Sequence, residues 1–125
     1  MIKLHRGFTL IELLVVMAII ATLLSMTVPR YFHSVDKSKE VALHGDLSVM
    51  RDAIDKYFSD HAKYPDNLDE LVEKKYLRSI PVDPMTDSNQ TWASTPPEGH
   101  LEGRVRDVKS GAKGVARDGS NFSEW

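Results

Sequence analysis

The N-terminal part of the chain separates into a short cationic segment and a long apolar run. Residues 1–7 include Lys3 and Arg6, and in residues 8–28 the only charged side chain is Glu12. About 21 helical residues at ~1.5 Å each span ~31 Å, which matches a hydrocarbon core of ~30 Å. An ordinary secretory signal has a shorter apolar core, of about 7 to 15 residues, followed by a small-x-small cleavage site. The pattern therefore predicts a transmembrane anchor that stays in the protein.

The charges around this run predict its orientation. Lys3 and Arg6 should stay on the cytoplasmic side by the positive-inside rule, which places the chain beyond the span on the other side of the membrane. Glu12 needs a separate explanation, because an ionised Asp costs about 2.5 to 3.5 kcal/mol at the centre of an inserted helix. We therefore expect Glu12 to have a partner. The alternative is a simple anchor whose Glu12 reaches the membrane surface.

Pro29 directly follows the apolar run. A proline removes one helical hydrogen bond and disfavours helix at the residue before it, Val28. We expect a bend or a melted turn at this place, and the alternative is a proline that only ends the membrane span.

Beyond Pro29 an apolar side chain recurs every three or four positions, with charged and polar residues between. This period predicts an amphipathic helix over residues 34–60 with one buried stripe. The stripe consists of Leu43, Leu47, Met50, Ile54 and Tyr57. Since no second helix is long enough to pair with residues 34–60, a small sheet from the C-terminal half is the expected cover.

The sequence pattern of the C-terminal half predicts one short helix and two short strands. Asp66 is expected to cap a helix from Asn67 to Lys75, in which acidic residues lie near the start and lysines in the last turn. Residues 91–94 and 104–108 are candidate strands. The predicted fold is therefore α+β: a long N-terminal helix, embedded in the membrane over its first half, packs against a small antiparallel sheet with a short extra helix.

Composition excludes several classes of function. A chain of 125 residues has room for one small domain besides the anchor, and 16 Lys and Arg against 18 Asp and Glu give no electrostatic footprint for nucleic acid. The absence of Cys excludes disulfides, thiolate zinc sites and cysteine nucleophiles. No two histidines have the helical zinc spacing, and no phosphate loop, nucleophile elbow or paired-carboxylate motif stands out. We therefore expect no enzyme and no nucleic-acid partner.

The start of the apolar run resembles a known processing signal. The class III signal of type IV pilins and type II secretion pseudopilins is similar to the sequence Gly7-Phe8-Thr9-Leu10-Ile11-Glu12-Leu13-Leu14-Val15-Val16. The resemblance implies that a prepilin peptidase cuts between Gly7 and Phe8 and that Phe8 is then N-methylated. It divides the chain into a cytoplasmic leader at 1–7, a transmembrane and filament-core helix at 8–28, and a periplasmic pilin-like domain at 29–125.

Cleavage would supply the partner that Glu12 lacks. The new α-amino group at Phe8 has a reference pKa of about 7.7 to 8.0 and is mostly protonated at neutral pH. In a filament the Glu12 carboxylate can meet the amine of a neighbouring subunit, and at ~4 Å and an effective dielectric of ~20 the two attract by ~4 kcal/mol. Desolvation of the two charges opposes this gain. We therefore expect the pair to fix how neighbouring subunits are aligned more than to stabilise the filament. Pro29 joins Glu12 as an assembly residue by resemblance, since filament subunits of this family often carry a proline near this place.

The second half of the chain extends the resemblance to the major pseudopilin of type II secretion, through Tyr64-Pro65, Leu68–Val72 and Tyr76–Pro84. The resemblance implies a structural subunit, anchored by a single pass in the inner membrane with its C-terminus in the periplasm. Copies of it and other pseudopilins form a filament that drives type II secretion, built by a platform protein and an assembly ATPase. The alternative is a type IV pilus pilin serving adhesion, motility or DNA uptake. Many such pilins have a C-terminal disulfide loop, so the absence of Cys favours secretion.

The resemblance also implies calcium, which the C-terminal loop of major pseudopilins binds. Hard cations require several oxygen ligands, and the candidates are Asp107, Asp118, Ser120 and Asn121. This loop departs from a well-formed acidic loop because Lys109, Lys113 and Arg117 lie among those oxygens. Turn-forming Asp, Asn and Gly without a metal are the alternative.

Overall fold

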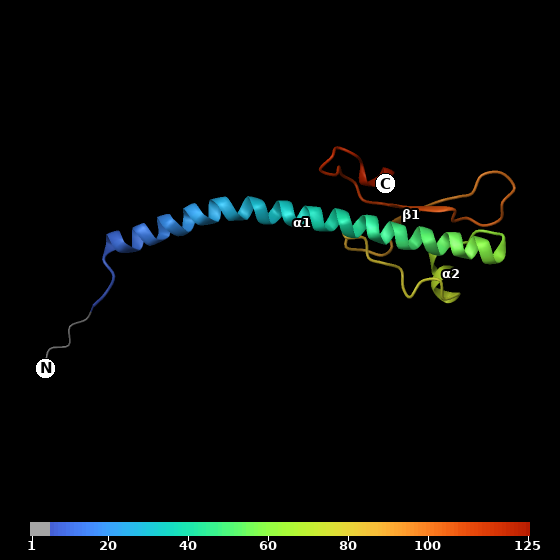
Figure 1. Cartoon of the computed structure of the whole chain (residues 1–125), viewed down its shortest axis with the longest axis horizontal. Helices are drawn as coiled ribbons and strands as arrows, with labels where there is room; N and C mark the ends of the chain where they lie inside the picture. Colours follow the sequence, from blue (N-terminus) through green and yellow to red (C-terminus); the bar gives the residue numbers. More distant parts are fainter. Residues whose placement is uncertain (1–5) are drawn as a thin grey trace. The chain divides into compact units, whose positions relative to one another are not determined.

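The structure is a computed structural model that describes residues 6–125. It divides the chain into two compact units, which meet between Asp36 and Lys37. In chain order the elements are helix α1 (Leu10–His61), helix α2 (Leu68–Glu73), strands β1 (Trp92–Thr95) and β2 (Asp107–Ser110), and a 3₁₀ helix η1 (Phe122–Glu124) (Figure 1). One long helix, one short helix and a two-stranded antiparallel sheet confirm the predicted α+β class.

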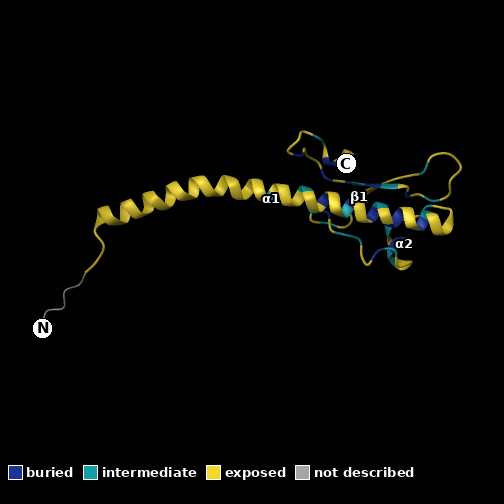
Figure 2. Ribbon diagram, viewed as in Figure 1, coloured by how far each residue is buried: buried dark blue, intermediate teal, exposed yellow. Residues whose placement is uncertain are grey.

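The first unit consists mainly of the apolar part of α1. Every residue from Arg6 to Ser34 is exposed, and Figure 2 shows this part of the helix without buried positions. Its large apolar side chains lie on all sides of the helix and do not form one stripe. This distribution is expected of a helix whose surroundings are apolar on every side. This part of α1 therefore has the composition of a membrane span.

Pro29 lies inside α1, and the helix continues through it, so the expected melted turn is absent. A proline in a helix interior costs about 3 kcal/mol. Melting a turn would leave further main-chain groups without partners beside an apolar environment, which costs more. Two hydroxyls in the preceding turn also add hydrogen bonds: Ser25 Oγ donates to the Thr22 carbonyl at 2.7 Å, and Thr27 Oγ1 donates to the Leu23 carbonyl at 2.9 Å.

In the second unit, the rest of α1 carries the core. The predicted stripe of Leu43, Leu47, Met50, Ile54 and Tyr57 is buried, together with Ala53, and this confirms the periodic pattern (Figure 2). Side chains from α2, β2, the chain segments between them and the C-terminal residues cover the stripe, namely Leu71, Leu77, Val105, Val108, Ala112, Ala116 and Phe122. Burying a large apolar side chain contributes about 1.5 to 3 kcal/mol, so this cluster holds the second unit together.

Helix α2 begins one residue later than predicted. Asn67, and not Asp66, is the N-cap, because the Asn67 Oδ1 accepts a hydrogen bond from the Glu70 N–H at 2.8 Å. The Glu70 carboxylate reaches back and accepts from the Asp66 N–H at 2.8 Å. At its other end the helix stops at Glu73 instead of Lys75. Lys75 cannot continue the helix, because its φ of 66° is in the left-handed region.

The sheet has the expected pairing but a later second strand. Strand β1 pairs with β2 from Trp92 opposite Ser110 to Thr95 opposite Asp107, so the strand predicted over residues 104–108 begins about three residues too early. The Arg104 and Val105 N–H groups instead donate to the Pro65 carbonyl, at 3.1 and 3.0 Å. Gly103 makes this contact possible, since a Cβ there would lie 2.1 Å from the Tyr64 carbonyl oxygen.

The turn around the Pro-Val-Asp-Pro sequence is organised by a buried carboxylate. Asp83 is fully buried; its Oδ1 accepts from the Met85 N–H at 2.8 Å, and its Oδ2 accepts from the Ser110 hydroxyl. The Asp83 main chain binds Ser88 and Asp87 as well. This residue therefore fixes the loop before β1 onto the end of β2.

Candidate functional site

The predicted cleavage site lies before α1, in a segment without helix or strand. Residues 6–9 are outside the helix, and the Phe8 side chain is 84% exposed. A Cβ built on Gly7 would meet no atom within 4 Å, and its φ is not in the left-handed region. The fold of this chain therefore does not require glycine at position 7. A requirement for glycine there would come from the peptidase that recognises the cleavage site. Residues 1–5 of the predicted leader lie outside the described residues.

Glu12 has a partner within its own helix, which the sequence analysis did not foresee. The Glu12 N–H donates to Thr9 Oγ1 at 3.2 Å, and Glu12 Oε2 accepts from the Thr9 N–H at 3.5 Å. This reciprocal pair is a capping box, and its signal was present in the sequence as Thr followed three positions later by Glu. The carboxylate thus lies over the first turn of α1, where the helix dipole favours negative charge.

Glu12 and the cleavage site share one surface recess. This recess has a volume of about 210 Å³ and is lined by Arg6, Gly7, Phe8 and Glu12. The first residue of the predicted mature chain and the predicted assembly carboxylate are therefore neighbours before any processing. Pro29, the other predicted assembly residue, lies elsewhere in the first unit, within the continuous helix.

Helix α1 is long and apolar enough to cross a membrane by length and composition, near the N-terminus of the chain. The most apolar part of this helix has no buried residue, unlike the core helix of a soluble protein. The helix begins at Leu10, so Phe8 and Thr9 of the predicted span lie before it, and the bounds 8–28 stay a prediction.

The four predicted calcium ligands divide among three hydrogen-bonded sets. Asp107 Oδ1 accepts from Arg51 Nε and from the Val108 N–H, both at 2.8 Å. The second set is a turn in which Asp118 Oδ1 accepts from the Ser120 N–H at 2.9 Å and from the Ser120 hydroxyl at 2.6 Å. The Ser120 hydroxyl holds the pKa of Asp118 below its ordinary value.

Asn121, the fourth candidate, donates from its side-chain amide to Glu124 Oε1 at 3.3 Å. Within residues 6–125 no three His, Cys, Asp or Glu side chains group so that they could hold a metal ion. The side chains therefore do not assemble one ligand set, and calcium stays a prediction.

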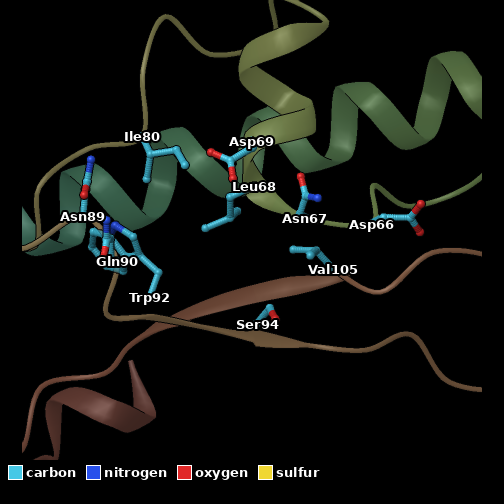
Figure 3. A pocket seen from close by; sticks show the side chains of 10 residues that line it. All are labelled: Asp66, Asn67, Leu68, Asp69, Ile80, Asn89, Gln90, Trp92, Ser94 and Val105. Atoms are coloured by element: carbon cyan, nitrogen blue, oxygen red, sulfur yellow. The ribbon is translucent and has the colours of Figure 1, made fainter.

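A larger recess lies beside α2 and β1, among residues that the sequence analysis assigned to no site. Its volume is about 420 Å³, and Figure 3 shows it between the start of α2, the loop before β1, and β1 itself. Leu68, Ile80, Trp92 and Val105 supply its apolar lining, and Trp92 is fixed by a 2.8 Å hydrogen bond from its Nε1 to the Pro81 carbonyl. The other lining residues are polar, namely Asp66, Asn67, Asp69, Asn89, Gln90 and Ser94.

The N-terminal features define a class of protein. Residues 2–28 match the family described as the prokaryotic N-terminal methylation motif, which covers the cationic segment, the Gly7–Phe8 junction, Glu12 and the apolar helix. A chain with this arrangement is a prepilin-type protein with a single apolar helix.

Comparison of the whole chain identifies the group within that class. A type II secretion system core protein G of Klebsiella michiganensis is 29% identical over 137 residues, covering 97% of this chain and 93% of the relative. The core protein G of Pseudomonas aeruginosa is 34% identical over 96 residues, covering 64% of this chain and 68% of the relative. The fimbrial protein EcpC of Eikenella corrodens is 31% identical over 123 residues, covering 94% and 80%. The chain belongs to the type IV pilin-like family and, within it, to the pseudopilins named type II secretion system core protein G. No solved structure matches the chain.

Proposed function

We propose that this chain is a structural subunit of a pseudopilus, the filament that drives type II protein secretion. The observation that carries the proposal is the helix of the first unit, which is apolar on all sides, exposed along its length and part of the methylation motif. Such a surface is stable only in a membrane or against other apolar helices. A filament core made of packed copies of α1 supplies the second environment.

Processing connects the two environments. A prepilin peptidase on the cytoplasmic side would cut the exposed Gly7–Phe8 bond, and methylation would follow on the amine of Phe8. Before the cut, the recess at the start of α1 contains Arg6 and Glu12; after it, Arg6 is gone and a cationic amine stands in its place. The surroundings of Glu12 therefore keep a positive charge, but after the cut this charge is carried by the end of the chain that enters the filament.

Glu12 would then select the register of assembly. Its capping box occupies the main-chain N–H of Thr9, and a carboxylate has further lone pairs for the amine of a neighbouring subunit. In the apolar core of the filament an amine without a counter-charge is costly, so neighbours would settle where Glu12 and Phe8 meet.

The family fits anchoring of the helix in the inner membrane. The positive charges before the helix support a second unit on the periplasmic side. In this proposal a platform protein and an assembly ATPase extract the subunits, and other pseudopilins join the same filament. Calcium binding at the C-terminal turn would be an additional property of the second unit.

A type IV pilus pilin is the second candidate. The similarity to fimbrial protein EcpC favours it, and it shares every N-terminal feature described above. Several relatives named core protein G and the absence of Cys from the chain favour secretion.

Processing and secretion can be tested together in a strain that lacks its own copy of this gene. Gly7→Val should leave the precursor uncut and abolish both filaments and secretion, because the peptidase reads the leader side of the bond. The matched control is Gly45→Val, at a glycine that also has open space around its Cβ but lies in the second unit. That variant should still be cut. Normal secretion by uncut Gly7→Val protein would contradict the proposal.

A further inference from the structure

Three side chains on one face of α1 hold the end of the chain. Glu40, His44 and Arg51 are four and then seven positions apart, which places them along one side of a helix. Each contacts the C-terminal segment, defined here as residues 107–125. We call these three side chains the α1 clasp; all of them and the whole segment belong to the second unit.

Glu40 holds the middle of the segment. Its Oε1 accepts from the Arg117 N–H at 2.8 Å, and its Oε2 accepts from Arg117 Nε at 2.9 Å. The Glu40 side chain is only 12% exposed, so this ion pair is partly shielded from solvent and salt. Both oxygens of the carboxylate are used, and the main-chain bond fixes the backbone of the segment as well as a side chain.

Arg51 joins the beginning of the segment to its end. Its Nε donates to Asp107 Oδ1 at 2.8 Å, and its Nη2 donates to the Val108 carbonyl at 3.0 Å and to the Trp125 main-chain oxygen at 2.6 Å. A guanidinium is always charged and presents its donors in a fixed fork. The Arg51 guanidinium therefore neutralises Asp107 and holds the two ends of the segment, at Val108 and Trp125, against α1.

His44 holds the same end by stacking. Its ring lies 3.9 Å from the Trp125 ring, with 8° between the planes. Trp125 Nε1 donates to the Ser120 hydroxyl at 2.7 Å, and that hydroxyl donates to Asp118. The predicted calcium ligands Asp118 and Ser120 are thus linked to α1 through Trp125.

The geometry points to a C-terminal segment that is held by the α1 clasp and does not need calcium to be ordered. A calcium ion requires six to eight oxygens at about 2.3 to 2.6 Å, which must be free to turn toward it. Asp107 Oδ1 is instead paired with Arg51, and Asp118 Oδ1 is paired with both donors of Ser120. A calcium ion that used Asp107 would bind a carboxylate that already has a cationic partner, Arg51 Nε at 2.8 Å, and the two cations would repel each other. The guanidinium of Arg51 thus does at Asp107 what a metal ion would do, because it neutralises the carboxylate and draws main-chain oxygens together.

Isolated ion pairs on a protein surface contribute little to stability. The clasp differs in that Glu40 and Arg51 each make more than one charge-assisted hydrogen bond, part of them to the main chain. Its contribution should therefore exceed that of an exposed pair such as Arg106–Glu98, whose nearest atoms are 3.7 Å apart.

Hydrogen exchange of the full-length chain in detergent micelles tests the inference. The probes are main-chain amides whose bonds exist only when the segment is folded, such as Ala116 N–H to the Ser120 carbonyl. Exchange of residues 114–125 would be compared in millimolar calcium chloride and in EGTA, for the wild type and for Arg51→Gln, Glu40→Gln and the control Glu98→Gln. Local exchange measures the equilibrium between closed and open forms of the segment.

The wild type should exchange at the same rate with calcium and with EGTA. Arg51→Gln should exchange about tenfold faster in both, as loss of charge-assisted bonds predicts. Glu40→Gln should show a smaller increase, and Glu98→Gln should match the wild type. Two results would overturn the inference: protection that calcium restores and EGTA removes, or clasp variants that exchange at the wild-type rate. The comparison of calcium with EGTA in the wild type holds even if a variant fails to fold.

Discussion

At the scale of single residues, Glu12 has two roles that differ in energy. It caps its own helix through Thr9, and an N-cap interaction contributes about 0.5 to 2 kcal/mol. In the proposed filament it also neutralises the amine of a neighbouring subunit, and removing one partner of a buried pair costs about 3 to 5 kcal/mol. Assembly should therefore depend on the charge of Glu12 more than on its capping.

Glu12→Ala should enter the membrane at least as well as the wild type, because it removes the charge that makes insertion costly. Cleavage at Gly7 should persist, whereas filaments should not form. Membrane fractionation measures insertion, and shearing or cross-linking measures assembly. Normal filaments from this variant would show that Glu12 is a tolerated carboxylate at the membrane surface.

The control variant is Thr9→Ala, which removes the cap and keeps the charge of Glu12. It should weaken assembly only slightly. Equal loss of filaments in the two variants would assign the role of Glu12 to capping.

Gly103 should be intolerant of any side chain. Its φ of 105° is left-handed, and a Cβ would lie 2.1 Å from the Tyr64 carbonyl oxygen. Gly103→Ala should lower the free energy of unfolding by at least about 2 kcal/mol, from backbone strain and displacement of the Tyr64 main chain. Gly119→Ala is the matched control, since φ there is 90° but a Cβ would meet open space. Thermal unfolding should show the larger loss at Gly103, and equal losses would mean that Tyr64 moves freely.

Short motifs predict single residues from the sequence alone, as at the Gly7–Phe8 junction and Glu12, whose roles stay predictions. The prediction of Asp66 as the N-cap is wrong by one position, because neighbouring N-cap residues look alike in a sequence. Arg51 could not be found in this way, because its partner Asp107 lies 56 positions away. Charge pairs at such separations depend on how the chain folds back, which no local pattern contains.

At the scale of helices and strands, long periodic patterns of apolar residues predicted the structure most reliably. The stripe on α1 was confirmed because burial of one helix face repeats over many turns. The strand over residues 104–108 was misplaced because it is short, and the Pro65 carbonyl takes the N–H groups of Arg104 and Val105. The melted turn expected at Pro29 is absent, because one lost hydrogen bond costs less than a melted turn in an apolar helix.

The contact between α1 and α2 should make the second unit sensitive to acid. The Tyr57 hydroxyl donates to Glu70 Oε1 at 2.6 Å, which lowers the pKa of Glu70 and raises the pKa of Tyr57 to about 12. A lowered carboxyl pKa contributes stability above its ordinary value of 4.5, and this is lost as the pH falls through the folded-state value. A raised tyrosine pKa contributes below 10.0, and this is lost as the pH rises toward about 12.

Tyr57→Phe isolates this contact, because it keeps the ring in the core and removes the hydroxyl. The wild type should lose more thermal stability than the variant as the pH is lowered from neutral through 4.5. Melting temperatures followed by circular dichroism across this range provide the measurement. Parallel pH profiles for the two proteins would exclude Glu70 as a source of acid sensitivity.

At the scale of the whole molecule, the core of the second unit lies within residues 37–125. A fragment that begins near Arg30 should therefore be soluble without the apolar helix and should unfold cooperatively. Near-ultraviolet circular dichroism and thermal unfolding are the measurements. Aggregation, or the absence of a near-ultraviolet signal, would mean that the stripe on α1 belongs to a contact between subunits.

The central claim is that this chain is cut after Gly7 and assembled through the helix that the cut exposes. Mass spectrometry of the N-terminus of the subunits in sheared, purified filaments tests it most directly. The account predicts filaments whose subunits begin at N-methylated Phe8 and contain no residue of the leader. Filaments whose subunits retain Met1 would contradict it.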